Sequence, residues 1–203
     1  MSKIETTDEL RQIYETPKGR SVIKVLDRLD RHARRFIELS PFLVLASSGN
    51  TGQADASPRG EAPGFVQVVD DYTIAIPDRP GNNRLDTMEN ILERPEIGLI
   101  FFLPGVNETL RINGTAEVRD DNDLLGGFEV DGKLPATVLL VHVREVYLHC
   151  AKALMRSRLW EEDAKHGTRP IPTMGRMIKD QTSSTEPDEP EDQMIKRYRK
   201  MLY

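Results

Sequence analysis

The chain has 203 residues, of which 38 % are hydrophobic and 30 % are charged, and its formal net charge is −5. This composition is typical of a globular protein with one sizeable core, and the acidic balance argues against a nucleic-acid partner. No apolar run approaches the roughly 20 residues that span a bilayer, and the first ten residues lack the apolar stretch of a signal peptide. We therefore expect no membrane partner and a cytoplasmic location.

Cysteine and histidine usage argues against disulfide and metal sites. The single cysteine, Cys150, follows an apolar run and is expected to be a buried structural thiol. The four histidines never fall at the i, i+4 spacing or in an H-E-x-x-H motif, so no metal site is predicted. The glycine-rich motifs of dinucleotide-binding and P-loop proteins and the G-x-S-x-G motif of α/β-hydrolases are missing, so those functions lose their usual support.

The first forty residues carry two helical patterns. Thr6 and Glu9 have the spacing of a capping box at a helix start. Apolar residues from Val22 to Ile37 recur at the i, i+3, i+4 and i+7 positions, which predicts one amphipathic helix. Basic residues occupy much of its other surface. Because acidic residues are interleaved with them, a solvated helix face is favoured, with nucleic-acid or membrane contact as the alternative.

Strand-like patterns dominate the chain after Ser40. About seven of them follow one another in hairpin order with few helices between them, which favours an antiparallel barrel or sandwich over a parallel sheet. The run Ile97–Leu103 is almost continuously apolar and should be a central strand buried on both faces. The other expected elements are strands at 42–48, 53–57, 65–69, 72–76, 109–119 and 137–149, and helices at about 83–93 and 121–128.

The end of the chain differs in composition from the rest. Residues 160–172 are polar and loop-like, and residues 181–193 are acidic and contain prolines, which predicts a mobile linker. The final ten residues can form one or two helical turns. Their apolar side chains could dock on the barrel or on a partner subunit.

The segment 74–90 has the features of an anion site. It runs from a strand, through a Pro/Gly turn, into a helix that Asn82 or Asn83 can cap. The free N–H groups at the start of a helix favour a bound phosphate. The spacing therefore allows a phosphate site at this turn.

Arginines near this turn could complete a phosphate clamp. Arg84 and Arg79 lie in the turn. Arg59 and the hydroxyl of Ser57 come from an earlier strand, at the segment DASPRG. The alternative is that the three arginines form ordinary ion pairs. Their alternative partners would be Asp78, Asp86 and Glu61.

Two further groups of residues could contact a ligand. Thr109, Arg111 and Asn113 project from one side of a strand, which suits the edge of a heteroaromatic ring, although an exposed sheet face gives the same pattern. Trp160 closes a basic segment whose cations and indole could cover a ligand. The alternative for Trp160 is a hydrophobic anchor for the C-terminal segment.

Four ordered segments carry a resemblance to a known family: ADASPRGEAPGFV, TIAIPDRPGNNRLDTMENILERPEIGLIFFLPG, ETLRINGTAEV and HCAKALMRSRLW. Together they resemble the pyridoxamine 5′-phosphate oxidase-like superfamily of flavin proteins, and more narrowly its uncharacterised FMN-dependent subgroup. The resemblance covers roughly residues 20–165. It implies a mainly β (α+β) fold, an antiparallel six-stranded FMN-binding split β-barrel with flanking helices. It also implies a homodimer with two FMN sites at its interface.

The resemblance suggests a division of the chain and a set of phosphate contacts. Residues 1–40 would form helices packed on the barrel, residues 41–160 the FMN-binding barrel, and residues 161–203 a loop, an acidic linker and a helical tail. The strand that contacts the FMN phosphate in the family would contribute Ser57 and Arg59. The turn that makes the second phosphate contact would contribute Asn83 and Arg84, and because Asn83 stands where a basic residue is usual, Arg79 would replace its charge.

The resemblance also implies contacts to the flavin ring. The backbone of Ile76 and Pro77 would lie along the isoalloxazine, and Trp160 would reach it across the dimer. Thr109 stands where the oxidases carry a glutamine that reaches the flavin. Because threonine is shorter, Arg111 is the better candidate for touching the ring or the substrate.

The expected activity is that of an FMN-dependent oxidoreductase acting on an unknown small molecule by hydride transfer at the flavin. Pyridoxamine phosphate itself is not expected as the substrate, because the end of this chain does not match the arginine-containing substrate pocket of the oxidases. A non-catalytic flavin-binding or flavin-sensing module is the alternative. A split barrel that uses F420 or haem is another, with His142 and His149 as axial ligands only in principle.

Overall fold

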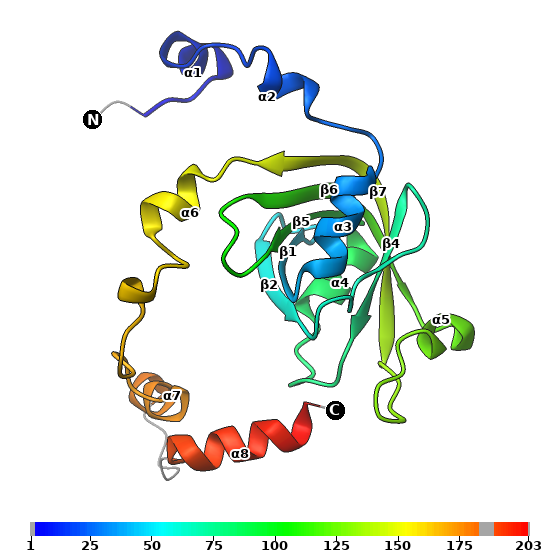
Figure 1. Ribbon diagram of the computed structural model, residues 1–203, viewed down its shortest axis with the longest axis vertical. Coiled ribbons are helices and arrows are strands. Elements are labelled where there is room, and N and C mark those ends of the chain that lie inside the picture. The colour runs from blue at the N-terminus through cyan, green and yellow to red at the C-terminus, as the bar shows by residue number, and fades with distance from the viewer. Residues whose placement is uncertain (1–2, 183–188, 203) are drawn as a thin grey trace.

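The computed structural model describes residues 3–182 and 189–202. Within these ranges the chain forms one curved antiparallel sheet with helices at its openings and at both ends of the chain (Figure 1). The strands are β1 (Phe42–Ser48), β2 (Ala54–Gly60), β3 (Gln67–Val68), β4 (Thr73–Asp78), β5 (Glu96–Phe102), β6 (Thr109–Arg119) and β7 (Thr137–His149). The helices are α1 (Thr7–Ile13), α2 (Arg20–Ile23), α3 (Arg31–Leu39), α4 (Asp86–Glu93), α5 (Asn122–Gly126), α6 (Lys152–Ser157), η1 (Glu162–Ala164), α7 (Met174–Thr182) and α8 (Glu191–Met201).

The strand order is β2-β1-β5-β6-β7-β4-β3, and every neighbouring pair is antiparallel. This confirms the predicted mainly β split barrel with flanking helices. The sheet has seven strands rather than six, because the two-residue strand β3 adds one at the edge. The sheet is not closed by backbone hydrogen bonds, since β2 and β3 remain its two edges.

A bulge between Asn113 and Gly114 divides the long β6–β7 ribbon in two. A Cβ atom on Gly114 would lie only 2.0 Å from the carbonyl oxygen of His142, so only glycine allows β6 and β7 to approach this closely. On one side of the bulge β7 also pairs with β4; on the other, β7 continues to His149 without β4. A bulge bends the ribbon and increases its twist, which separates the part of β6–β7 that closes the barrel from the part that projects beyond it.

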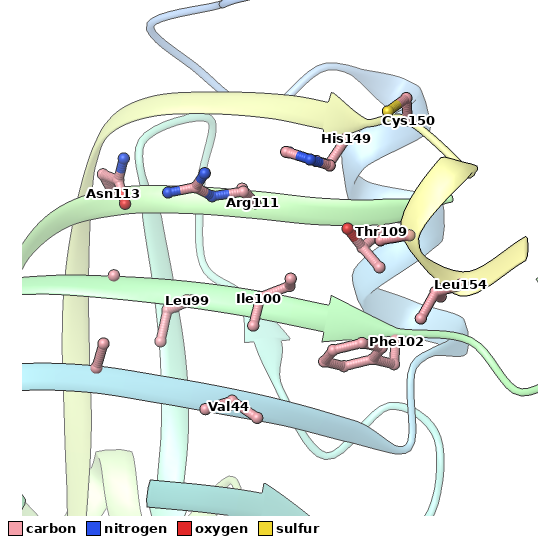
Figure 2. Close-up of a pocket in the computed structure, with 13 residues that line it drawn as sticks. Val44, Leu99, Ile100, Phe102, Thr109, Arg111, Asn113, His149, Cys150 and Leu154 are labelled. Atoms are coloured by element: carbon pink, nitrogen blue, oxygen red, sulfur yellow. The ribbon is translucent and has the colours of Figure 1, made fainter. Parts of the chain in front are cut away.

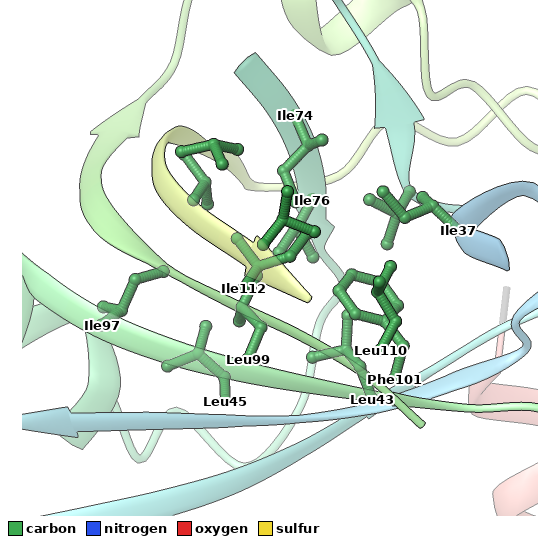
Figure 3. Close-up of a cluster of buried hydrophobic side chains, with 14 of the residues drawn as sticks. Ile37, Leu43, Leu45, Ile74, Ile76, Ile97, Leu99, Phe101, Leu110 and Ile112 are labelled. Carbon is green, nitrogen blue, oxygen red and sulfur yellow. The ribbon is translucent and has the colours of Figure 1, made fainter. Parts of the chain in front are cut away.

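The hydrophobic core fills the inner face of the sheet (Figure 3). Alternate residues of β1, β5 and β6 point inward, which follows from the two-residue period of a strand. Leu45, Leu99 and Ile112 lie opposite one another across the three strands and are at most 1 % exposed. Each such burial contributes about 2 kcal/mol by removal of apolar surface from water.

Helices α3 and α4 cover the openings of the sheet. Asp30 caps α3 by accepting a hydrogen bond from the backbone N–H of Ala33 at 2.8 Å. The residue that follows α3, Ser40, is fully buried and donates its hydroxyl to the carbonyl of Phe102 at 2.7 Å. The residues that the two helices bury are Ala33, Phe36, Ile37, Thr87, Met88 and Ile91.

The single helix predicted between Val22 and Ile37 was wrong. The chain leaves the helical conformation after Ile23, and Leu26 exchanges two backbone hydrogen bonds with Val146 on the edge of β7 that β4 leaves free, at 2.8 and 3.0 Å. A new helix then begins after Asp30. Apolar spacing could not reveal the break, because Leu26 and its neighbours fit a helical stripe as well as an extended segment.

The helices at the two ends of the chain bury none of their described residues, in contrast to α3. Helices α1 and α2 extend from one side of the sheet, and the chain from α6 to α7 curves away from another (Figure 1). The predicted linker 181–193 falls partly outside the described residues, at 183–188, whereas residues 181–182 end α7 and 191–193 begin α8. Within the described ranges, no helix has the length and apolar character needed to cross a membrane.

Candidate functional site

The three arginines predicted to clamp a phosphate all form ion pairs in the structure. Arg79 binds Glu61 through two hydrogen bonds of 2.9 and 3.2 Å. Arg59 pairs with Asp78. Arg84 pairs with Asp86, which lies two residues later in the sequence. These partners are the carboxylates named above as the alternative.

Two of these ion pairs connect the edge strand β2 with the end of β4, near the other edge of the open sheet. Arg59 lies on β2 and its partner Asp78 ends β4, while Glu61 follows β2 and Arg79 follows β4. Their side chains are 11–17 % exposed, so the charges are largely removed from water. Because β2 and β4 share no backbone hydrogen bonds, these pairs act as a clasp across the split of the barrel.

The third pair is different, because it is exposed. The Arg84 side chain is 76 % exposed, and the hydrogen bond that it donates to the carboxylate of Asp86 raises the pKa of its guanidinium. The predicted helix cap at Asn82 or Asn83 was wrong: Leu85 precedes α4, Asn82 Oδ1 accepts from the N–H of Arg84 at 3.0 Å, and Asn83 has a φ of +57°. The helix begins later because this local turn takes up both asparagines. Arg84 borders a hollow that also contains acidic side chains: Asp55, Asp86, Glu89 and Glu93.

A pocket of about 440 Å³ opens on the outer face of the sheet (Figure 2). One wall is apolar and comes from β1 and β5, and the opposite wall is polar and comes from β6 and β7. Helix α6 covers one end with Ala153 and Leu154. The apolar wall contains Val44, Ala46, Ile100 and Phe102, and the polar wall contains Thr109, Arg111, Asn113 and His149.

Strand alternation explains why these side chains share one face. Leu110 and Ile112 point into the core, so Thr109, Arg111 and Asn113 point outward, as the sequence predicts. Strand β5 was expected to be buried on both faces; its inner side is buried, whereas its outer side is only half-buried because it forms the pocket wall. Gly98 keeps the wall flat, since an added Cβ would lie 3.1 Å from Asn113 Oδ1.

Arg111 is the cation of the polar wall. Its guanidinium lies 5.3 Å from the ring centroid of Tyr147, and Lys24 approaches the same ring at 5.3 Å. Lys24 also donates to the carbonyl of Leu148 at 2.8 Å. Among the residues that the structure describes, Arg111 forms no ion pair, unlike Arg59 and Arg84.

His149 lines the pocket, although the sequence suggested for it only a role as an axial haem ligand in principle. Its Nδ1 is buried and has no hydrogen-bond partner within the described part of the chain. Burial, together with the positive charges of Arg111 and Lys24, lowers the pKa of its imidazole. The signal was present in the strand pattern, because His149 is the register partner of Thr109.

Cys150 was expected to be buried, and this was wrong, because it is exposed at the rim of the pocket. Strand β7 ends at His149, so Cys150 lies in the turn before α6 and no longer in the apolar strand pattern. Its pocket position places it beside His149 (Figure 2).

The remaining predicted residues lie apart from this pocket. Ser57 is half-buried on the core-facing side of β2, where it lies opposite Leu45. Ile76 and Pro77 are buried in β4. Trp160 donates its indole N–H to the carbonyl of Val106 at 2.9 Å, which anchors the segment after α6 to the β5–β6 loop. Of the ten predicted residues, one chain thus brings only Thr109 and Arg111 together in this pocket.

The fold and the pocket define an antiparallel split β-barrel with a ligand-sized pocket on its outer face. Residues 29–150 match the family model described as pyridoxamine 5′-phosphate oxidase, and the chain belongs to this family. The matched range contains all seven strands and ends directly after His149. The predicted superfamily is therefore confirmed. No curated protein matches the chain.

Several solved structures are similar to this chain. HupZ of Group A Streptococcus has 18 % sequence identity and a TM-score of 0.49, with 59 % of this chain and 93 % of that chain covered. A candidate pyridoxamine 5′-phosphate oxidase from Lactobacillus delbrueckii has 19 % sequence identity and a TM-score of 0.49, with 60 % of this chain and 95 % of that chain covered. An F420 reductase has 14 % sequence identity and a TM-score of 0.42, with 60 % of this chain and 98 % of that chain covered. At these scores the similarity says nothing about what this chain binds.

Proposed function

We propose that this chain binds FMN and acts as an FMN-dependent oxidoreductase on a small molecule. The observation that carries the proposal is the outer-face pocket, in which an apolar wall stands opposite a polar one. A flavin ring has matching character, because its aromatic faces are apolar whereas one edge carries carbonyl and N–H groups. Membership of the pyridoxamine 5′-phosphate oxidase family supports a flavin over other flat ligands.

The residues of the pocket fit such a ring. The volume of about 440 Å³ lies within the range of roughly 300–1,000 Å³ that is common for small-molecule sites. Arg111 and His149 both line it, and His149 Nδ1 has no hydrogen-bond partner among the described residues. Because buried polar groups are normally hydrogen-bonded, a ligand is the natural source of the missing partner.

Arg84 is the residue we assign to the phosphate. Its ion pair with Asp86 is exposed, and exposed pairs contribute so little that a phosphate can replace the carboxylate. Arg59 and Arg79, by contrast, are committed to the clasp across the split. Ser57 and Asn83 stay as predicted supporting contacts, and Arg59 and Arg79 would join them by exchanging their carboxylate partners for the phosphate.

A homodimer with FMN at its interface would unite these groups. In one chain the predicted residues occupy separate places, so a complete site requires the pocket of one copy to meet the Arg84 turn of another. The outer sheet face has apolar side chains for a partner to cover, including Phe42, which is 40 % exposed. In this arrangement Ile76, Pro77 and Trp160 stay as predicted ring neighbours.

The bound FMN would supply the redox chemistry by hydride transfer at its ring. The chain's own residues bind and orient it. Thr109, Arg111 and Asn113 offer polar groups to one edge, while α6 shields one end of the pocket from water. The substrate would be a small molecule that stacks on the exposed ring face.

The absorption spectrum of the purified protein tests the proposal. We expect flavin bands, or their appearance on mixing with FMN, and release of FMN on denaturation. Gly98→Leu should prevent binding by filling the pocket, whereas the control Gly126→Leu should not, because an added Cβ there meets nothing within 4 Å. A colourless protein that does not take up FMN would overturn the proposal, and a Soret band or F420 absorbance would assign the pocket to haem or F420.

Turnover tests the enzymatic part of the proposal. Reduction of the bound flavin by NAD(P)H, or rapid reoxidation by oxygen, is the expected result. If the bound flavin is neither reduced by NAD(P)H nor rapidly reoxidised by oxygen, the protein is a non-catalytic flavin-binding module instead.

A further inference from the structure

His149 is a partly buried residue with one fully buried, unused hydrogen-bonding atom. The imidazole lies at the end of β7, at the boundary between the polar wall of the pocket and α6 (Figure 2). Its Nδ1 is one of only two buried side-chain N or O atoms without a partner among the described residues, and the other, Arg59 Nε, lies elsewhere. A buried polar atom without a partner costs free energy, so its presence on a residue that lines a pocket points to a group supplied by a ligand.

Burial and two positive charges lower the pKa of the His149 imidazole. After burial, the contributions come from Arg111 on β6 and from Lys24 on the segment before α3. No carboxylate contributes to this shift. The imidazole is therefore neutral at physiological pH, and one ring nitrogen carries a hydrogen that it can donate.

We propose that the neutral His149 donates a hydrogen bond from Nδ1 to a carbonyl group on the ring edge of the ligand, while Arg111 supplies the positive charge beside it. This inference rests on the proposed flavin function and names a residue that the family resemblance does not assign. The two side chains have different roles. Arg111 provides the charge, and the neutral imidazole provides a directed hydrogen-bond donor, whereas a cationic imidazole would be repelled by Arg111.

Such a pair should favour the reduced flavin over the oxidised one. Reduction increases the negative charge on the ring edge, and a fixed cation and donor beside that edge stabilise the additional charge more than they stabilise the neutral ring. His149 therefore affects two measurable properties, the affinity for oxidised FMN and the reduction potential of the bound flavin.

The test uses the full-length protein and variants at two histidines of the same strand. His149→Phe keeps the ring and removes both nitrogens, whereas His149→Asn keeps a donor near the position of Nδ1. His142→Phe is the matched control, because His142 also lies on β7 but faces Glu117 at 3.2 Å and does not line the pocket. The FMN dissociation constant is measured by quenching of flavin fluorescence, and the potential by equilibration with a reference dye.

For His149→Phe we expect about tenfold weaker FMN binding, the loss that one buried hydrogen bond causes. A further tenfold loss of preference for the reduced flavin corresponds to a potential lower by about 30 mV. His149→Asn should recover most of both effects, and His142→Phe should resemble the wild type. If His149→Phe does not fold, His149→Leu replaces it.

The outcomes separate this inference from the proposed function. If the wild-type protein binds FMN and the His149 variants have the same FMN affinity and reduction potential, the role of His149 is overturned but the proposed function is not. An equal loss in His142→Phe overturns it as well, because the effect would then not arise in the pocket. Wild-type protein that does not bind FMN overturns both proposals.

Discussion

The arginines at the split of the barrel and the arginine on its outer face have opposite electrostatic environments. Arg59 and Arg79 each lie against a carboxylate with little exposure to water. Arg111 faces a pocket, next to an aromatic ring and a neutral imidazole, and forms no ion pair among the described residues. An arginine near a carboxylate is already neutralised, so of these three arginines Arg111 is the one whose charge is available to a ligand in one chain.

The same contrast separates structural from ligand-binding roles. A largely buried ion pair resists replacement, because removing one partner leaves the other charge desolvated. An unpaired cation in a pocket instead gains from an incoming anionic or carbonyl-bearing group. Arg84 lies between the two cases, since its partner Asp86 is present but exposed.

The largest effect should follow removal of the pocket cation. Arg111→Ala is expected to weaken FMN binding about a hundredfold, because a desolvated hydrogen bond to a charged group is lost, and the melting temperature should hardly change. Riboflavin should lose affinity equally, since the contact is to the ring. The matched control is Arg119→Ala on the same strand, whose arginine pairs with Glu117 and Asp121 away from the pocket. Equal losses in the two variants would show that the position of Arg111 in the pocket has no specific role in binding.

The clasp should show the reverse behaviour. Asp78→Ala leaves Arg59 desolvated without its partner, and we expect a loss of about 2 kcal/mol in the free energy of unfolding. Urea denaturation measures this loss. The control Asp86→Ala breaks an exposed pair and should leave stability unchanged. If both variants are equally stable, the pairs across the split have no structural role.

Arg84→Ala examines the intermediate case. We expect about tenfold weaker binding of FMN and no change for riboflavin, because the lost contact is to the phosphate. Flavin fluorescence titrations with the two ligands give the comparison. A parallel loss for both ligands would place Arg84 near the ring rather than the phosphate.

The smallest expected effect concerns pH. The folded protein holds His149 below its ordinary pKa of 6.5, so the unfolded chain takes up this proton first as the pH falls. The contribution to stability is therefore unchanged above 6.5 and is lost as the pH decreases from 6.5 through the lowered pKa. Compared with His149→Asn, the wild type should lose about 2 °C more in melting temperature between pH 7 and pH 5. The charged groups that face this histidine are Arg111 and Lys24.

Sequence patterns located the sheet well and the boundaries of the helices less well. The strand Thr137–His149 has the predicted bounds, and the alternation around Arg111 placed the polar side chains correctly on the outer face. The prediction of a helix around Leu26 was wrong, because this segment forms backbone hydrogen bonds with the free edge of β7, which lies more than a hundred residues later in the sequence. Local spacing contains no information about such a distant partner.

The sequence by itself determined the family, the strand periodicity and the side of β6 on which Thr109 and Arg111 lie, because these depend on residue order and on the two-residue period of a strand. Only the tertiary structure decided which charges are neutralised. Arg59 meets Asp78 because the sheet curves until β2 faces the end of β4. The same curvature, with the turn into α6, leaves His149 beside Arg111 in a pocket, where burial and a neighbouring cation lower its pKa.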